Sequence, residues 1–420
     1  MEKAILVHFD INRKENLQAE ESMQELEGLA LAAGAEVIKE IFQFRPKKSA
    51  KYLIGEGKVS EIIQLKENLQ ADIIIFNHNL TPIQQRSLED EIQVKVIDRT
   101  QLILDIFAQR ARSREGKLQV ELAQLSYLSP RLTGKGRNLS RLGAGIGTRG
   151  PGEKKLEEDR RRIQDRIAKI KKDILKIQKR RTNQRKRREK GPVPFVSLVG
   201  YTNAGKSTLF NALSNEKMFI STQPFATLDP VLRRVCFNDG LSFFLSDTVG
   251  FIQKLPVELI EAFNATLEEV NEADCLCHVI DLSSSHCDSQ ISAVENLLSE
   301  IGASNIPIIK IYNKVDLLPN EKDLLKRNKD LKNQSVYISA KNREGIHDLK
   351  KVLYSLLFKD LKLFYLQIPK SNKETTQSFD KWSFVLKRRE NKDYYELKIM
   401  AHPDSLLNYL PYIRKGEANW

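Results

Sequence analysis

The sequence predicts an α/β protein built from several domains. The chain has 420 residues, which at about 100 to 200 residues per domain corresponds to two to four domains. Short apolar runs alternate with helical patterns over residues 1–99 and again over 193–360, which is typical of largely parallel, doubly wound sheets covered by helices. Apolar residues make up 41% of the chain and charged residues 29%, so the composition excludes wholesale disorder.

Two long helical runs separate these two α/β domains. The first extends from Thr100 to Leu128 and the second begins near Glu153. Apolar residues in the second run repeat at spacings of three and four, which indicates a coiled-coil seam: Leu156, Ile163, Ile167, Ile170, Ile174 and Ile177. We expect a long antiparallel helical hairpin over residues 100–190, with the glycine-rich loop 131–152 at its tip. The alternative is a parallel coiled coil that dimerises the chain through the isoleucine seam.

The positive charge of the chain is concentrated in this hairpin. Lys and Arg number 68 against 55 Asp and Glu, a formal net charge of +13. Residues 131–190 contain 23 basic and 7 acidic residues, net +16, whereas the other 360 residues are net −3. Many charges on the second helix fit an ordinary solvated face. The tip loop has no acidic residue, so we predict that its five basic residues bind RNA phosphates: Arg131, Lys135, Arg137, Arg141 and Arg149.

Composition also predicts the compartment. No window approaches about 18 uncharged apolar residues, so we expect neither a membrane span nor a secretion signal. The four cysteines lie on or near apolar runs, which fits reduced thiols in a cytoplasmic protein. Cys275-Leu-Cys277-His278 could be a metal cluster, but one residue between thiols is not the usual zinc spacing. The run reads better as a buried strand.

The first strand of the 193–360 domain leads directly into a phosphate-binding loop, GYTNAGKST. Its glycines allow backbone N–H groups to surround phosphates, and the following helix adds the positive end of its dipole. Lys206 would reach the outer phosphates, and the Ser207 hydroxyl would bind Mg²⁺. The predicted nucleotide contacts in this segment are Gly200, Tyr201, Thr202, Asn203, Ala204, Gly205, Lys206, Ser207 and Thr208.

Later motifs identify the nucleotide as GTP or GDP. Asp247 ends an apolar strand, where it can hold Mg²⁺ through water, and the Gly250 N–H can meet the γ-phosphate. Asp316 of the NKVD motif can accept hydrogen bonds from guanine N1–H and the 2-amino group, which adenine lacks. The predicted base contacts are Asn313, Lys314, Asp316, Ser339, Ala340 and Lys341. A P-loop GTPase domain therefore follows the hairpin.

The sequence leaves the catalytic residue of this domain unknown. Phe251 stands where Ras-like enzymes carry a water-orienting Gln, so we expect slow hydrolysis until a partner supplies the missing element. Thr227 is the expected switch threonine on Mg²⁺, with Thr222 as the alternative. Asn203 resembles the potassium-ligating Asn of some GTPases that lack the Gln, so K⁺ is a further candidate cofactor.

The last residues, 361–420, contain strand-like runs and should form a small α+β domain, but no motif in them indicates a chemistry.

Five segments closely resemble the HflX family of bacterial GTPases, with similarity from about residue 3 to 360: YLIGEGKVSEI, LTPIQQRSLEDEI, VIDRTQLILDIFAQRARSREGKLQVELAQLSYLSPRL, GTRGPGEKKLEEDRRRI and PFVSLVGYTNAGKSTLFNAL. The resemblance implies a factor that binds the large ribosomal subunit and its RNA, and we expect the chain to be a monomer. It also implies that the GTPase is stimulated there and that stalled ribosomes are split under stress, with the hairpin tip reaching the peptidyl-transferase region. ATP binding by the N-terminal domain is likewise implied, for which Gly55-Glu56-Gly57-Lys58 is a weak loop signal. The alternative is a signalling-type GTPase switch whose coiled coil docks or dimerises proteins.

Overall fold

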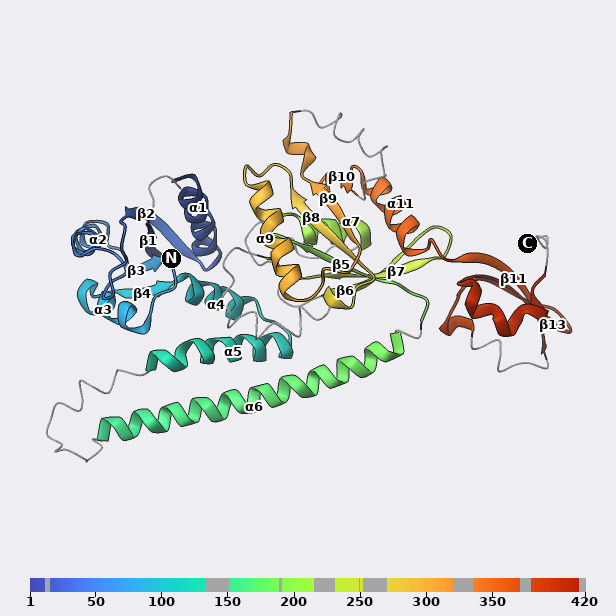
Figure 1. Cartoon of the computed structure of the whole chain (residues 1–420), viewed down its shortest axis with the longest axis horizontal. Helices are drawn as coiled ribbons and strands as arrows, with labels where there is room; N and C mark the ends of the chain where they lie inside the picture. Colours follow the sequence, from blue (N-terminus) through green and yellow to red (C-terminus); the bar gives the residue numbers. More distant parts are fainter. Residues whose placement is uncertain are drawn as a thin grey trace. The chain divides into compact units, whose positions relative to one another are not determined.

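The computed structural model describes residues 1–11, 16–132, 151–188, 191–214, 231–248, 250–251, 270–319, 335–370 and 379–414. The chain divides into two compact units, each considered by itself below. The first is formed mainly by Met1–Lys176, and the second mainly by Ile177–Ile220, Pro230–Phe251 and Thr266–Trp420. Figure 1 traces the elements in chain order. Within the described ranges, no helix is both long enough and apolar enough to cross a membrane.

The first unit begins with a four-stranded parallel sheet in the order β2-β1-β3-β4. Its strands are β1 (Glu2–Asp10), β2 (Ala35–Phe44), β3 (Ile73–Phe76) and β4 (Lys95–Asp98), connected through α1 (Asn16–Ala32), α2 (Glu56–Leu69) and α3 (Pro82–Ile92). Every residue of β3 is buried, as expected where helices cover both faces of a parallel sheet. Helix α3 starts with a capping box, in which Thr81 and Gln84 satisfy each other's backbone N–H groups. The predicted α/β domain is confirmed.

The single helix expected from Thr100 to Leu128 is wrong, because the structure has two helices there. Helix α4 (Arg99–Arg110) packs against α1 and β4 of the first sheet, and α5 (Arg114–Leu128) begins after a break. The cause is local: the Ser113 side chain accepts a hydrogen bond from the Gly116 N–H at 2.8 Å and caps a new helix. Helix α4 therefore belongs to the sheet domain, and only α5 forms part of the hairpin.

The antiparallel hairpin is formed by α5 and the long helix α6 (Pro151–Arg188), as Figure 1 shows. Arg166 donates to both carboxylate oxygens of Glu121, at 2.6 and 2.8 Å. The pKa of Asp173 is lowered by a hydrogen bond from Lys176 and further by the positive charge of Arg114. Arg114 lies seven residues before Glu121 in α5, and Asp173 lies seven residues after Arg166 in α6. The two helices are therefore antiparallel. The seam residues Ile170 and Ile174 are buried. Within one chain, α5 therefore lies along this side of α6 in the antiparallel arrangement expected for the hairpin.

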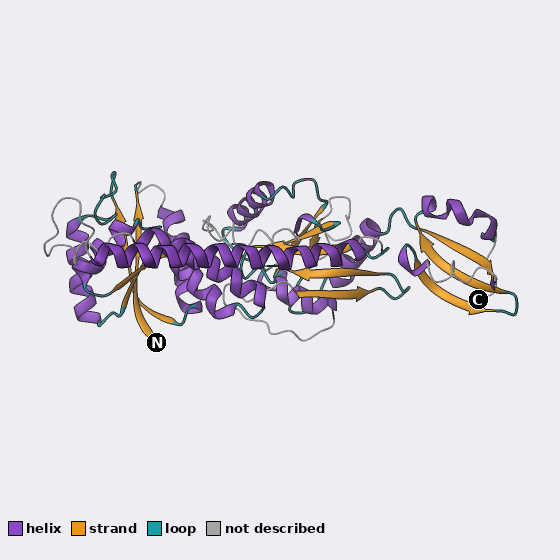
Figure 2. Cartoon of the chain, turned by 90° about the horizontal axis from the view of Figure 1, so that it is seen from below, coloured by secondary structure: helices purple, strands orange, loops and turns teal. Residues whose placement is uncertain are grey.

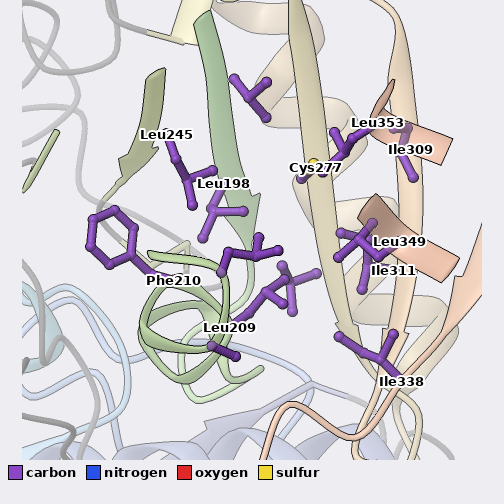
Figure 3. Packing of buried hydrophobic residues seen from close by; sticks show 14 of the residues in the cluster. Leu198, Leu209, Phe210, Leu245, Cys277, Ile309, Ile311, Ile338, Leu349 and Leu353 are labelled. Atoms are coloured by element: carbon purple, nitrogen blue, oxygen red, sulfur yellow. The ribbon is translucent and has the colours of Figure 1, made fainter. Parts of the chain in front are cut away.

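The second unit contains a six-stranded sheet in the order β10-β9-β8-β5-β7-β6, parallel except for β6. The strands are β5 (Phe195–Gly200), β6 (Val231–Cys236), β7 (Ser242–Asp247), β8 (Cys275–Asp281), β9 (Ile308–Asn313) and β10 (Ser335–Tyr337). The helices include α7 (Lys206–Ser214), α9 (Cys287–Glu300) and α11 (Ile346–Leu357), with the short turn η3 (Val315–Leu317) after β9. Leu209 of α7 and Leu349 of α11 pack with Leu198 and Ile311 of the sheet in one buried cluster (Figure 3). The doubly wound domain is confirmed.

The thiols of β8 belong to this core. Cys275 and Cys277 point to the same side of the strand and are fully buried and free, and burial together with a hydrogen bond involving Cys275 raises the pKa of Cys277. Strand alternation places His278 on the opposite face, where burial lowers its pKa to about 4. The three side chains thus do not converge on one point.

A small antiparallel sheet completes the second unit, in the order β11-β13-β12. Its strands, β11 (Lys362–Pro369), β12 (Phe384–Glu390) and β13 (Tyr394–Ala401), are orange in Figure 2, and the turns η7 (Phe379–Lys381) and η8 (Pro403–Tyr412) accompany them. Phe358 after α11, Leu241 at the β6–β7 turn and Phe384 of β12 form a buried cluster that attaches this sheet to the GTPase core. The predicted α+β domain is confirmed.

Candidate nucleotide-binding site

The loop between β5 and α7 requires glycine at two positions. A Cβ on Gly200 would lie 2.3 Å from the Val279 carbonyl oxygen, and Gly200 has φ +148. A Cβ on Gly205, at φ +95, would lie 2.2 Å from Nδ2 of Asn313. A side chain at Gly200 would have to displace backbone, and one at Gly205 would have to displace the Asn313 amide. The loop therefore turns tightly into the first residue of α7, where free N–H groups and the helix dipole favour an anion.

Lys206 is the buried cation of this loop. Its Nζ donates to the carbonyl oxygens of Gly200 at 3.0 Å and Tyr201 at 2.7 Å, and the residue is only 7% exposed. Burial lowers its pKa to about 8, and the negative charge of Asp247 opposes this shift. An ammonium held by two carbonyls in a desolvated site lacks a full counter-charge. A phosphate group would supply that charge.

Two oxygen-bearing side chains that could bind a metal ion, Ser207 and Asp247, lie beside Lys206. The Ser207 hydroxyl, in the first turn of α7, donates to Oδ2 of Asp247 at 2.7 Å. Asp247 is the last residue of β7 and is completely buried. A hydroxyl and a carboxylate at this spacing are hard oxygen ligands of the kind that Mg²⁺ takes, so these residues fit the metal. Thr227 and its alternative Thr222 lie outside the described residues.

The residue in the usual glutamine position is built into the sheet. The Phe251 N–H donates to the Gly200 carbonyl at 3.1 Å, and its own carbonyl accepts from the Thr202 N–H at 2.7 Å. The side chain is buried, 3% exposed, and carries no polar atom. Gly250 lies next to the phosphate loop, since a Cβ there would come within 2.9 Å of Cγ2 of Thr202. Phe251 therefore cannot orient a water molecule through its side chain.

Asn313 joins the three sequence motifs of the predicted site. Its Nδ2 donates to the Ala204 carbonyl of the phosphate loop at 2.9 Å, and its Oδ1 accepts from the Ala340 N–H at 2.9 Å. Asn313 is 2% exposed, so both bonds are shielded from water. The phosphate loop, the strand end after β9 and the Ser339–Lys341 segment are thus held together by one amide side chain.

The carboxylate predicted to read the base, Asp316, is also held in place. The Ser339 hydroxyl donates to Oδ1 of Asp316 at 2.7 Å and accepts from the Asn342 N–H at 3.1 Å. Lys314, in the left-handed conformation at φ +64, forms an ion pair with Asp281 at 2.7 Å. Asp281 was missed by the sequence reasoning. Its available signal was its place as the last residue of a buried strand, which it shares with Asp247.

Arg131 is a correction to the predicted RNA-binding set. It lies in the turn η2 (Ser129–Leu132), and its guanidinium donates to Leu80 O at 2.8 Å, Tyr127 O at 2.9 Å and Asp98 Oδ2 at 3.3 Å. The guanidinium carbon also lies 3.4 Å from the Tyr127 ring centroid. These partners are in the first unit, so Arg131 fixes the base of the hairpin. The other predicted residues, Lys135, Arg137, Arg141 and Arg149, lie outside the described residues.

Comparisons with known proteins assign the family. Residues 20–108 and 110–188 match the N-terminal and middle regions of a GTP-binding GTPase family, and residues 195–314 match the model described as 50S ribosome-binding GTPase. GTPase HflX of Caldanaerobacter subterraneus is 49% identical over 88% of this chain and 83% of its own length. GTPase HflX of Escherichia coli is 44% identical over 88% of this chain and 86% of its own length.

Solved structures also match, among them the crystal structure of SsGBP with GDP, at a TM-score of 0.48 and 25% identity, covering 86% of this chain and 99% of that one. The identities to curated relatives over most of both lengths are far above those between unrelated proteins, and the phosphate loop and guanine motifs occupy their expected strand ends. This chain is therefore a GTP hydrolase that belongs to the HflX family of GTPases.

Proposed function

We propose that this GTPase binds the large ribosomal subunit and uses GTP binding and hydrolysis to dissociate stalled ribosomes under stress. The observation that carries the proposal is the combination, in one chain, of the guanine-nucleotide site with a hairpin whose tip loop is basic and free of acidic residues. The family model for residues 195–314 is that of a 50S ribosome-binding GTPase, which supports the target. If the bound nucleotide controls when the basic hairpin binds ribosomal RNA, RNA binding is coupled to GTP hydrolysis.

The nucleotide contacts proposed here follow the sequence motifs that Asn313 brings together. Ser207, Asp247 and Thr227 would hold Mg²⁺, with Asp247 acting through water. Mg²⁺ would neutralise charge on the β- and γ-phosphates. The proposed GTP contacts are residues 200–208 together with Gly250, Asn313, Lys314, Asp316, Ser339, Ala340 and Lys341.

The test is co-sedimentation with ribosomes followed by subunit analysis. We expect the chain to sediment with the large subunit in a non-hydrolysable GTP analogue but not in GDP, and to convert 70S ribosomes into subunits. A variant in which Lys135, Arg137, Arg141 and Arg149 are replaced by Ser should lose sedimentation while retaining GTP binding. Ribosome-independent self-association with no sedimentation would contradict the proposal and support the signalling alternative.

We also propose that the ribosome supplies the catalytic element that Phe251 does not. Since the Phe251 side chain is buried and apolar, intrinsic hydrolysis should be slow and rise at least about 10-fold with large subunits. Equal rates with and without large subunits would contradict this. Asn203, exposed and at φ +60, would hold K⁺ near the phosphates. Equal rates in sodium and potassium would exclude that role.

A further inference from the structure

The small sheet of residues 362–401 lies beyond the segments matched by the family models, which end at residue 314. It has two different faces. On one face, Leu366 of β11 and Leu397 and Ile399 of β13 are fully or almost fully buried. They pack with Phe379 of η7 and Leu406 of η8 in one cluster. This face is the core of the domain.

The opposite face is set by the strand register. Tyr365 is paired with Lys398, and Lys398 with Lys387, so one row crosses all three strands. The next row on the same face consists of Gln367, Glu396 and Arg389, and Tyr394 follows opposite Pro369. None of these side chains is buried, and Lys387 and Arg389 are exposed. Only the row of Phe384 and Met400, nearest the GTPase core, joins a buried cluster. Beyond that row, the described residues of this face are half-buried or exposed, and we call it the open face.

Charge and aromatic character coincide on this open face. Three cations, Lys387, Arg389 and Lys398, accompany the single acid Glu396. The ammonium of Lys398 lies over the ring of Tyr365, 5.5 Å from the ring centroid, so a cation already contacts one face of this ring. Residues 361–420 contain 11 basic and 7 acidic residues, net +4. This domain thus adds a second positive region to a chain whose excess charge otherwise resides in residues 131–190.

We propose that the open face of the three-stranded sheet binds single-stranded RNA. Half-buried tyrosines on a sheet, as Tyr365 and Tyr394 are here, can still offer a ring face for stacking with unpaired bases, and lysines or arginines beside them follow the phosphates. Tyr394 is four residues from Lys398 along β13, about 13 Å, so Tyr365 and Tyr394 would take different bases. In double-stranded RNA the base faces are stacked on one another and cannot stack on tyrosine. An acidic protein surface would use the cations but has no bases to stack on the rings. The pairing of rings with cations therefore favours unpaired RNA over both.

The first test compares two charge reversals in the full chain. Lys387→Glu with Arg389→Glu changes the open face, whereas Lys362→Glu with Lys381→Glu changes two exposed lysines outside it by the same amount. With a fluorescent 12-mer of oligouridine at fixed salt, we expect the first pair to weaken binding at least about 10-fold and to reduce the salt dependence. The second pair should change binding less than about twofold. Equal losses from both pairs would overturn the proposal.

The second test separates stacking from charge. Tyr365→Phe keeps the ring and should bind oligouridine as the unaltered chain does, whereas Tyr365→Thr should weaken binding about 5- to 100-fold. Photocrosslinking of 4-thiouridine RNA should map to peptides containing Tyr365 or Tyr394. Unchanged binding of the Thr variant, or capture of an acidic peptide by a face that does not bind RNA, would overturn the proposal. Both tests use RNA without ribosomes, so their failure is distinct from failure of the ribosome proposal.

Discussion

Two carboxyl edges of parallel sheets in this molecule look alike in sequence but are used differently. At the edge of the first sheet, Asn77 follows β3, Asp98 ends β4 and Arg99 comes directly after it, and all three are buried. At the edge of the GTPase sheet, the loop after β5 is bounded by Gly200 and Gly205, and Asp247 ends β7. Ligands of α/β proteins bind at such edges, so polar residues there suggest a binding site in both sheets.

The contacts distinguish the two edges. The carboxylate of Asp98 accepts from the Leu80 N–H, the Gln101 N–H, the Tyr127 hydroxyl and Arg131. Arg99 likewise donates to Asn77 and Glu25. The chain's own side chains occupy the first edge, whereas the second edge offers loop N–H groups and a desolvated Lys206. A polar strand end is thus a binding site only where backbone and glycine leave room for the ligand.

The largest expected effect is that of Asp98→Ala on stability. Removing this carboxylate takes away the counter-charge of Arg131 and the acceptor that Tyr127 shares with it, and losing one partner of a buried ion pair costs about 3–5 kcal/mol of unfolding free energy. Hydrogen exchange measured by mass spectrometry should show the loss in β4, α4 and α5.

Two controls sharpen this result. Asp90, whose side chain is 74% exposed, should tolerate Asp90→Ala with a change below about 0.5 kcal/mol. Asp247→Asn should impair GTP hydrolysis and leave exchange in the first unit unchanged. If Asp98→Ala exchanges like the unaltered chain, the anchoring role assigned to Asp98 is incorrect.

The next effect concerns the room left for the nucleotide. Gly205→Ala should reduce GTP affinity at least about 100-fold, because the new Cβ would displace Asn313 and with it the phosphate loop. Equilibrium binding of a fluorescent GTP analogue measures it. Gly57→Ala is the matched control, since no atom lies within 4 Å of its Cβ position. Comparable affinities in the two variants would show that the loop does not carry the binding.

A smaller effect is expected at the base. Asp316→Asn replaces a carboxylate with an amide that presents one donor and one acceptor, so GTP should bind about 5- to 100-fold more weakly. Xanthosine triphosphate, which has a carbonyl in place of the 2-amino group, should bind better than it does to the unaltered chain. Competition between the two nucleotides reports the switch. Unchanged preference for GTP would remove Asp316 from base reading.

The smallest effect is a pH dependence from Lys206. Its pKa in the folded, nucleotide-free chain is about 8, below the ordinary 10.5, so burial of the charged form costs stability below pH 8. That cost disappears as the pH rises through 10.5. Phosphate favours the charged form, so GTP binding should take up a proton above pH 8, and affinity should fall by up to about 10-fold per pH unit. Calorimetry in buffers of different ionisation enthalpy measures the proton.

Lys206→Arg is the control for this titration, because its guanidinium stays charged throughout the range. Any GTP binding that remains in the Arg variant should lose the lysine-dependent slope between pH 8 and 9. The same slope in both proteins would assign the pH dependence to another group.

The strand, loop and helix around the phosphate-loop motif were predictable from the sequence because their backbone geometry is local. The turn at Gly200 and Gly205 and the first turn of α7 are determined by neighbouring residues, so GYTNAGKST could be placed on a strand, loop and helix without any tertiary information. The bond from Asn313 to Ala204 spans 109 residues, and only the order of the strands brings these two together. The pairing of Lys314 with Asp281 escaped prediction for the same reason.

Arg131 shows where local reasoning fails. In the sequence it opens a cationic, glycine-rich stretch, and its charge alone suggests RNA. Its acceptors at Leu80 and Asp98 are 51 and 33 residues away, so no local pattern could reveal them. The break between α4 and α5 was missed because Ser113 can either continue a helix or cap a new one.

The sequence by itself determined the α/β class, the order of the domains, the location of the positive charge and the nucleotide chemistry, because periodicity and short motifs act over a few residues. Only the tertiary structure decided which polar side chains are hydrogen-bonded within the fold and which face solvent. Asp98 and Arg131 are satisfied within the first unit, while Lys387, Lys398 and Tyr365 share one open sheet face. The physical reason is that burial and strand register arise from contacts between residues far apart in the chain.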